Sequence, residues 1–181
     1  MEKEEFLKRL ETEIKISKMS DYTLRNYLIF NKQLLDHAKK LPEQIDTQDI
    51  KNFLADKMND KASASTILFL SAIRFAYLNT LKKDPTLGIK RPKKENKIPI
   101  VLTKEEVLKL FDCTETLKSN LMLQLLYSSG LRVSELVNLK KENLDFNENI
   151  GWVRKGKGKK DRMFIISQKL SKKLQKFISK H

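Results

Sequence analysis

Glycine and proline are scarce in this sequence, which holds 5 and 4 of them among 181 residues. That scarcity argues against a loop-rich or all-β fold and favours helices. Cysteine occurs once, at Cys113, so no disulfide can form within the chain and a reducing, cytoplasmic location is expected. The two histidines, His37 and His181, lie far apart without a cysteine cluster near them. We therefore expect neither a metal site nor a cofactor.

Long apolar runs are also missing. The run Leu121–Tyr127 is interrupted by Gln124 and is far too short to span a bilayer. The opening segment, MEKEEFLKRLE, lacks the apolar core of a signal peptide. Positive charge, in contrast, is abundant, because 37 Lys and Arg stand against 23 Asp and Glu and give a net charge of +14. Such an excess predicts a polyanionic partner, and with a membrane disfavoured we expect nucleic acid.

The first 81 residues are predicted to form a helical domain. Apolar residues recur there with the period of an α-helix, and the last helix is apolar nearly all round, which predicts a core position. The expected helices are Glu2–Ile16, a second one capped by Ser20 or Asp21 and ended by Leu41-Pro42, Thr47–Met58, and Ala64–Leu81.

A basic linker is predicted at 82–99. It contains three of the four prolines, and its first 16 residues hold seven Lys or Arg against two acidic residues. Proline disfavours helix and like charges extend a chain, so this stretch is expected to join two domains.

The remaining residues, 100–181, are predicted to form a mixed domain. Thr103 and Glu106 have the spacing of a capping box, which begins a helix at Lys104–Phe111. The next helix, Ser119–Ser128, is apolar on all sides and is expected to be buried, with Gly130 just beyond its end. The further expected elements are a helix at Arg132–Leu139, strands at Ile150–Lys155 and Asp161–Ile166, and a helix at Gln168–Ser179.

Arg132 is the first candidate functional residue, because it follows Gly130 at the predicted start of a helix. A helix start offers unpaired N–H groups, and a guanidinium can hold two phosphate oxygens at once. On its position alone, an ordinary solvated arginine is the simpler interpretation.

The turn between the two strands is the second candidate. Glycines at Gly156 and Gly158 alternate with lysines, and such a basic tip can enter a DNA groove or grip the DNA backbone. The same residues would also be expected in a solubilising turn that protects strand edges. The basic residues at and beside this turn are Arg154, Lys155, Lys157, Lys159, Lys160 and Arg162.

Together the two segments resemble the catalytic domain of tyrosine recombinases, most closely the Xer type. The family pattern is an apolar helix, then G-L-R-x-S-E-L, then two strands joined by G-K-G-x-K-x-R. Here GLRVSEL occupies Gly130–Leu136 and GKGKKDR occupies Gly156–Arg162. The segments Ser20–Leu35 and Ser63–Lys93 resemble the DNA-clamping helices of the same family, so the resemblance covers about residues 4–178.

The resemblance implies an activity and assigns roles. Arg132 matches the first catalytic arginine, Lys157 the catalytic lysine of the hairpin, and Glu135 an acidic residue that supports the site. In such enzymes a tyrosine attacks a DNA phosphate, arginine stabilises the charge that develops, and the lysine protonates the leaving 5′-oxygen. The 3′-phosphotyrosyl bond retains the energy needed for rejoining, so no metal or other cofactor is needed.

The implied architecture is mainly α. It comprises a helical SAM-like core-binding domain at 1–81, the linker at 82–99, and the first part of a mixed α+β catalytic domain with a small antiparallel sheet at 100–181. The expected partner is a duplex recombination site, on which the intact protein would form a homo-tetramer. The residues expected to contact DNA are Arg25, Lys32, Arg74, Lys90, Arg91, Lys93, Lys94, Arg154, Lys155, Lys159, Lys160 and Arg162.

The sequence departs from the family in one respect. It has no match to the family's downstream His-x-x-Arg pair, its further His or Trp, or its nucleophile. The tyrosines Tyr22, Tyr27, Tyr77 and Tyr127 lie in helices predicted as core, and none matches the nucleophile. We therefore expect the 181 residues alone to bind DNA without cleaving it. A recombinase whose remaining residues lie further along, a naturally truncated DNA-binding regulator and a generic basic DNA-binding protein all stay open, as do chromosome-dimer resolution and phage or plasmid integration.

Overall fold

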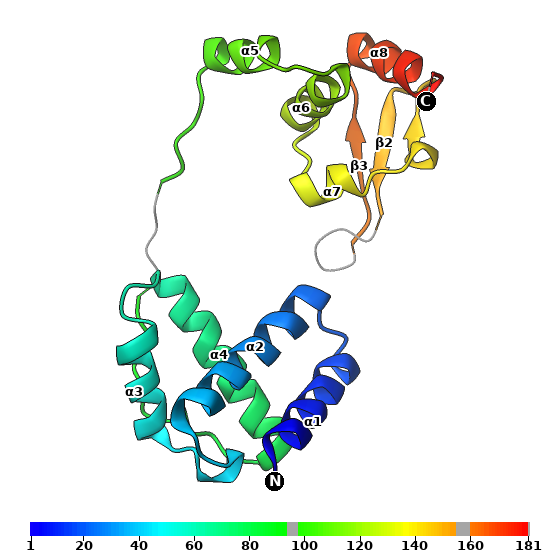
Figure 1. Cartoon of the computed structure of the whole chain (residues 1–181). Coiled ribbons are helices and arrows are strands. Elements are labelled where there is room, and N and C mark those ends of the chain that lie inside the picture. The colour runs from blue at the N-terminus through cyan, green and yellow to red at the C-terminus, as the bar shows by residue number, and fades with distance from the viewer. Residues whose placement is uncertain (94–97, 155–159, 181) are drawn as a thin grey trace. The chain divides into compact units, whose positions relative to one another are not determined.

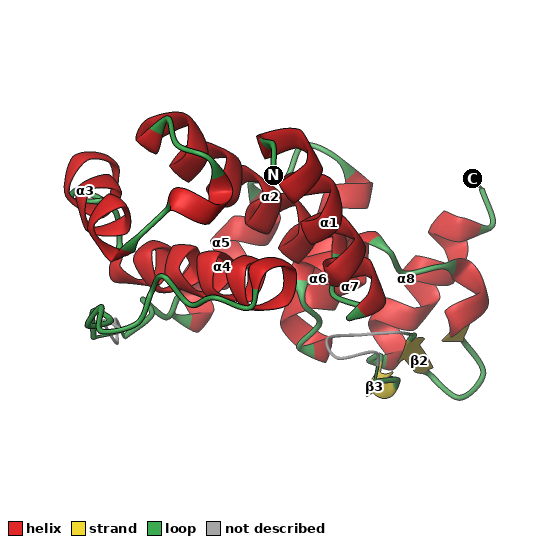
Figure 2. Cartoon of the chain, turned by 90° about the horizontal axis from the view of Figure 1, so that it is seen from below, coloured by secondary structure: helices red, strands yellow, loops and turns green. Residues whose placement is uncertain are grey.

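The computed structural model describes residues 1–93, 98–154 and 160–180. The chain folds into two compact units, Met1–Ile98 and Pro99–His181 (Figure 1). Most described residues that have regular structure are helical, and the strands form one small antiparallel sheet in the second unit (Figure 2). The predicted fold class, a helical domain followed by a mixed α+β domain, is confirmed.

Four α-helices and one short 3-10 helix form the described part of the first unit. Helices α1, α2 and α4 contact one another, and α3 packs on α2 (Figure 1). Their buried side chains form one core, in which Phe6, Leu34, Phe69 and Tyr77 are inaccessible to solvent. The elements are α1 (Lys3–Ile16), α2 (Asp21–Ala38), the short 3-10 helix η1 (Pro42–Gln44), α3 (Thr47–Lys57) and α4 (Ser63–Leu81).

Helix α4 has the central place that its composition predicts. Phe69, Ile73 and Ala76 are fully buried, and α4 contacts both α1 and α2. By length and composition alone α4 would also suit a membrane span. Its packing within the helical unit accounts for the same apolar composition, since a helix that is apolar all round is typical of a core.

Hydrogen bonds between residues close in sequence determine where two helices of this unit begin. The Ser20 hydroxyl accepts from the Thr23 amide, which begins α2 at Asp21. Asp46 accepts from the amides of Gln48 and Asp49, and the Asp49 carboxylate accepts from the Asp46 amide in return. These caps satisfy amide groups that a helix start leaves unpaired.

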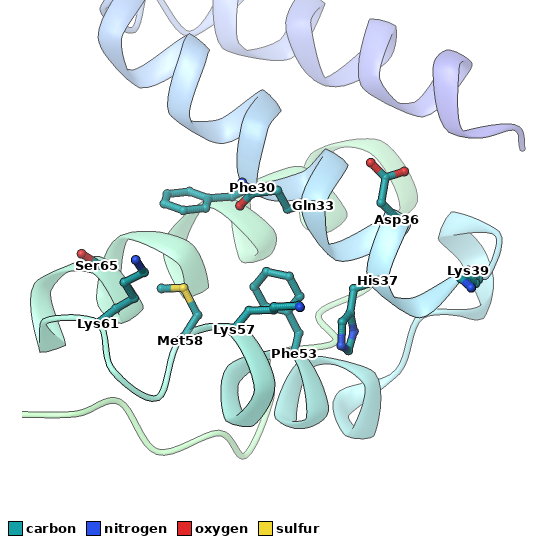
Figure 3. A pocket seen from close by; sticks show the side chains of 10 residues that line it. All are labelled: Phe30, Gln33, Asp36, His37, Lys39, Phe53, Lys57, Met58, Lys61 and Ser65. Carbon is teal, nitrogen blue, oxygen red and sulfur yellow. The ribbon is translucent and has the colours of Figure 1, made fainter.

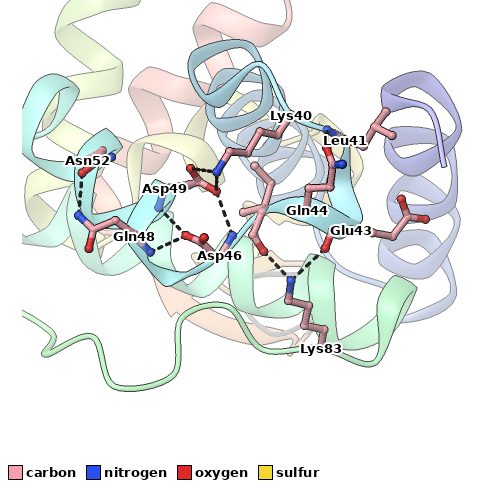
Figure 4. A network of polar contacts seen from close by, with 10 residues as sticks. Lys40, Leu41, Glu43, Gln44, Asp46, Gln48, Asp49, Asn52 and Lys83 are labelled. Carbon is pink, nitrogen blue, oxygen red and sulfur yellow. Dashed lines mark hydrogen bonds and ion pairs between the residues drawn. The ribbon is translucent and has the colours of Figure 1, made fainter.

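The beginning of the predicted linker is attached to the helical unit. The Lys83 ammonium donates to the carbonyls of Glu43 and Ile45, at 3.0 and 2.6 Å (Figure 4). Thr47 donates to the Pro85 carbonyl, and Ile89 packs against the helical core. The composition of this segment did not predict these contacts, because the identity of a residue as lysine does not show whether it binds backbone carbonyls or is solvated.

The second unit packs helices on one face of a three-stranded sheet of order β1-β2-β3. Gly151 pairs with Phe164 and Val153 with Arg162. The core combines Leu121 and Leu125 with strand and α8 residues. The elements are α5 (Lys104–Asp112), α6 (Leu117–Ser129), α7 (Val133–Val137), η2 (Lys141–Asn143), β1 (Leu144–Asp145), β2 (Ile150–Val153), β3 (Arg162–Ile165) and α8 (Gln168–Ile178).

Three features of this unit differ from expectation. Helix α6 is buried on one face only: Leu121 and Leu125 are buried, whereas Tyr127 is 61% exposed. Helices α5, α7 and α8 and strand β3 contact α6, and Met122 and Leu126 pack partly buried against the core, whereas Leu117 stays exposed. Strand β1 was not predicted, because two residues are too short to show an alternating pattern. Helix α7 has five residues where eight were expected.

Candidate active site and nucleic-acid interface

Arg132 lies where α6 gives way to α7. Gly130 ends α6 with a left-handed backbone (φ 60°), and its amide donates to the Leu126 carbonyl at 3.1 Å. A residue with a Cβ is strained in that conformation, which explains glycine at this point. Leu131 is buried in the core, and Arg132 follows with an extended backbone. The loop is therefore anchored immediately before an arginine whose side chain is 58% exposed.

The Glu135 carboxylate organises this loop. Its Oε2 accepts from the Arg132 amide at 2.9 Å, and its Oε1 accepts from Arg132 Nη1 at 2.9 Å. Only 5% of the Glu135 side chain is exposed. Two hydrogen bonds to Glu135 thus hold both the backbone and the guanidinium of Arg132.

Arg162 completes the same cluster from β3. Its Nη2 donates to Glu135 Oε2 at 2.6 Å and to the Gly130 carbonyl at 3.2 Å. The amide of Arg132 and then the guanidinium of Arg162 lower the pKa of Glu135 from 4.5 to about 2. The carboxylate is therefore ionised at neutral pH and lies between two cations. Reasoning from the sequence missed this role, since it assigned Arg162 to DNA contact alone.

The short helix α7 contributes less than expected. Arg132 occupies its N-cap position without a side-chain cap, and five residues build too small a dipole to form an anion site by themselves. At this helix start the Arg132 guanidinium, and not the helix dipole, is therefore the group suited to bind an anion.

The hairpin candidates are only partly described. Lys155, Lys157 and Lys159 lie outside the described residues, whereas Lys160 is described and exposed. Arg154 pairs with Asp161 at 2.9 Å, and its guanidinium lies 4.9 Å from the centre of the Trp152 ring. That ion pair links the residue directly after β2 to the residue directly before β3.

The basic residues of the helical unit are mostly exposed. Arg25 and Lys32 on α2 are solvent-accessible, as predicted from their position away from its apolar arc. Arg74 is also half-exposed, but its Nε pairs with Asp84 at 3.1 Å, so part of its charge is already neutralised. Past α4, the chain presents Lys90, Arg91 and Lys93 to solvent, and Lys94 lies outside the described residues.

The four tyrosines differ in exposure, which corrects the expectation that all lie in the core. Tyr77 is fully buried, and burial raises its pKa above the usual range. Burial also raises the pKa of the partly exposed Tyr27. Tyr22 and Tyr127 are 73% and 61% exposed, on α2 and α6. Helical periodicity identifies the apolar arc but does not show which of its residues a neighbouring helix covers.

The helical unit also contains a pocket that none of the predicted site residues lines. It has a volume of about 800 Å³, and its lining includes Phe30, Phe53 and Met58, with His37 next to Phe53 (Figure 3). His37 hydrogen-bonds Asp56 at 3.0 Å and meets the Phe53 ring edge-on. Among the described residues, no cluster of three or more His, Cys, Asp or Glu could hold a metal.

Models of known protein families match both units of the chain. Residues 6–86 match the phage integrase N-terminal SAM-like domain, and residues 100–181 match the phage integrase family. The chain belongs to the phage integrase family. The boundary between these matches agrees with the division of the structure into two units.

Curated relatives of this integrase-family chain include tyrosine recombinases. One from Pseudothermotoga lettingae is 33% identical over 178 residues, 91% of this chain and 62% of that protein. Tyrosine recombinase XerA of Thermococcus kodakarensis is 31% identical over 180 residues, 98% of this chain and 62% of that protein. A putative integrase/recombinase of Sinorhizobium fredii is 32% identical over 166 residues, 90% of this chain and 54% of that protein. The chain thus spans about half to three-fifths of these relatives.

Solved structures show the same fold. A lambda integrase tetramer bound to a Holliday junction aligns with a TM-score of 0.76 over 93% of this chain and 52% of that chain, at 20% identity. The Tn1549 transposon integrase in complex with transposon right end DNA aligns with a TM-score of 0.69 over 97% of this chain and 65% of that chain, at 15% identity. The helical unit and the mixed unit both have counterparts in this fold.

Proposed function

We propose that the protein to which this chain belongs carries out site-specific DNA recombination. Arg132 is the central residue of that proposal. Glu135 accepts hydrogen bonds from the Arg132 amide and from Arg132 Nη1, and the Arg132 side chain is 58% exposed. A guanidinium fixed in advance stabilises a developing charge without the cost of reorganisation. This preorganised, solvent-facing arginine is the observation that carries the proposal.

The proposed reaction is a transesterification. A tyrosine oxygen forms a bond to phosphorus, and the bond from phosphorus to the 5′-oxygen breaks. Arg132 stabilises the negative charge on the non-bridging oxygens, and Lys157 gives its proton to the departing 5′-oxygen. The reverse attack by a 5′-hydroxyl releases the tyrosine and joins new strands. The role of Lys157 follows from the family motif.

The proposed substrate is duplex DNA. Relatives of this fold have been solved on DNA, one of them as a tetramer on a Holliday junction, and we propose the same partner and a homo-tetramer for the intact protein. Exposed cations occur among the described residues of both units. They include Arg25 and Lys32 on α2, Lys90, Arg91 and Lys93 past α4, and Lys160 beside the hairpin tip. A cytoplasmic location is proposed with this role.

None of the four tyrosines is proposed as the nucleophile. Tyr77 is buried, and none of the four follows the two catalytic motifs in the sequence. We therefore propose that these 181 residues bind DNA without forming a covalent bond to it. A DNA-binding regulator of a recombination site is the alternative function that the same surface supports.

Sequencing the DNA fragments that this chain retains from a genomic library tests the proposal. A recombinase or a site-specific regulator should enrich fragments that share one short sequence. Retained fragments with no common sequence relative to the input would contradict site specificity.

A further inference from the structure

We propose that Arg162 is a positioning residue, which holds Glu135 and the Gly130 carbonyl in place and thereby orients Arg132, and that it does not itself contact DNA. This inference rests on the proposed function, because it assigns Arg162 a part in the site where Arg132 would hold phosphate.

Arg162 makes side-chain hydrogen bonds to the two residues that flank Arg132 in the site, Gly130 and Glu135. One nitrogen, Nη2, donates to both the Glu135 carboxylate and the Gly130 carbonyl. These two acceptors lie on either side of Arg132 in the sequence, at the end of α6 and within α7. The Arg162 side chain is 37% exposed, against 58% for Arg132, so the more accessible guanidinium is the one it supports.

The Glu135 carboxylate divides its oxygens between the two arginines. Its Oε2 accepts from Arg162 and from the Arg132 amide, and its Oε1 accepts from Arg132 Nη1. Within the described part of the chain, no hydrogen bond from Arg132 Nε or Nη2 is found. One edge of the Arg132 fork is thus engaged, and the other edge is available for a phosphate. Without Arg162, the carboxylate would be held by Arg132 alone and would lose its link to the sheet.

The hairpin strands set the position of Arg162. Arg162 pairs with Val153 as the first residue of β3, and the adjacent Arg154–Asp161 ion pair joins the strands again. The same two strands lead into the segment that contains Lys157. Arg162 therefore connects the strand pair that leads to Lys157 with the loop that contains Arg132.

A double-mutant cycle on DNA affinity tests this proposal with the 181-residue chain. Arg132→Gln should weaken duplex binding and reduce the log–log salt slope by about 0.9, the effect of one lost phosphate contact. Arg162→Gln should also weaken binding, but it should have no further effect in the Arg132→Gln background. Lys172→Gln, at an exposed position of α8, is the matched control. Its effect on affinity, measured in the wild-type and Arg132→Gln backgrounds, gives the loss caused by removing one positive charge. Additive losses would show direct DNA contact by Arg162 and overturn the proposal, as would no effect in either background.

A second measurement needs no substitution. In the wild-type chain, addition of duplex DNA should shift the guanidinium NMR signals of Arg132 and leave those of Arg162 in place. Large shifts at Arg162 with none at Arg132 would overturn the proposal.

A third measurement separates this inference from the proposed function. If the wild-type chain fails to bind DNA at any salt concentration, the proposed function fails. Hydrogen exchange at the Arg132 amide then decides the positioning role, because that amide donates to Glu135. Arg162→Gln should accelerate its exchange relative to Lys172→Gln, and an unchanged rate would overturn the role.

Discussion

Arg162 donates to the Glu135 carboxylate at 2.6 Å, although 27 residues separate them in the sequence. The contact connects a strand of the sheet to the loop that holds Arg132. It also keeps Glu135 ionised, since hydrogen bonds to a carboxylate favour its charged form.

The first prediction concerns stability against pH. Folding lowers the pKa of Glu135 from 4.5 to about 2, so its contribution to stability is complete above the higher value. As pH falls from 4.5 toward 2, that contribution should be lost. In urea titrations across this range, the wild type should lose more free energy of unfolding than Glu135→Gln, whose amide does not titrate. Glu148→Gln, at an exposed position outside this cluster, should retain the wild-type pH dependence. Equal pH dependence of the wild type and Glu135→Gln would show that this carboxylate does not stabilise the fold.

The second prediction concerns packing in the sheet. A Cβ on Gly151 would meet the Phe164 ring at 2.3 Å, so Gly151→Ala should overpack the core and cost about 1–3 kcal/mol. Chemical denaturation would measure the loss. The double variant Gly151→Ala with Phe164→Leu should recover part of it, because the smaller side chain makes room. A double variant no more stable than Gly151→Ala alone would contradict this explanation.

The elements that the sequence predicted well are those set by local bonds. The Thr103–Glu106 capping box forms as expected, with hydrogen bonds of 2.7 and 3.2 Å, and Gly130 adopts the left-handed conformation at the end of α6. Each of these depends on residues within one helical turn. Their spacing alone therefore contains the information.

The features that could not be predicted from the sequence depend on residues that are distant along the chain. The Glu135–Arg162 contact requires the register of a sheet that no local pattern specifies. The bonds from Lys83 to the carbonyls of Glu43 and Ile45 require a segment that lies 40 and 38 residues earlier in the chain. Likewise, the exposure of Tyr127 depends on which neighbours cover α6. Periodicity and composition contain none of this information.

The third prediction concerns covalent chemistry. The 181-residue chain should form no covalent bond to DNA, since none of its tyrosines matches the expected nucleophile. Incubation with a nicked suicide substrate, followed by denaturing electrophoresis, would reveal any adduct. A protein–DNA band that survives denaturation would mean that one of the four tyrosines reacts, and Tyr22 and Tyr127 would be tested first because they are exposed.

The fourth prediction concerns the catalytic assignment. In a form of the protein that includes the nucleophile, Arg132→Ala should reduce the cleavage rate by about 10²–10³, the usual effect of losing one preformed charge-stabilising donor. Lys157→Ala should slow cleavage, and a substrate with a 5′-bridging phosphorothioate should partly restore the rate, because that leaving group needs no proton.

Neighbouring lysines provide the matched controls for that assignment. Lys159→Ala and Lys160→Ala should weaken DNA binding without a cleavage defect that the phosphorothioate corrects, because phosphate-contacting lysines act as interchangeable point charges. If Lys159→Ala gave the larger defect and the modified substrate corrected it, the general acid would be Lys159 and the assignment to Lys157 would be wrong.

The fifth prediction tests the central claim, that this chain is the DNA-binding part of a tyrosine recombinase. With a net charge of +14 and exposed cations in both units, it should bind duplex DNA through several phosphate contacts. Each contact contributes about −0.9 to the slope of log affinity against log salt concentration. Fluorescence anisotropy between low and moderate salt should therefore give a straight line with a slope of several units. An affinity that does not change with salt, or no binding at low salt, would contradict the account.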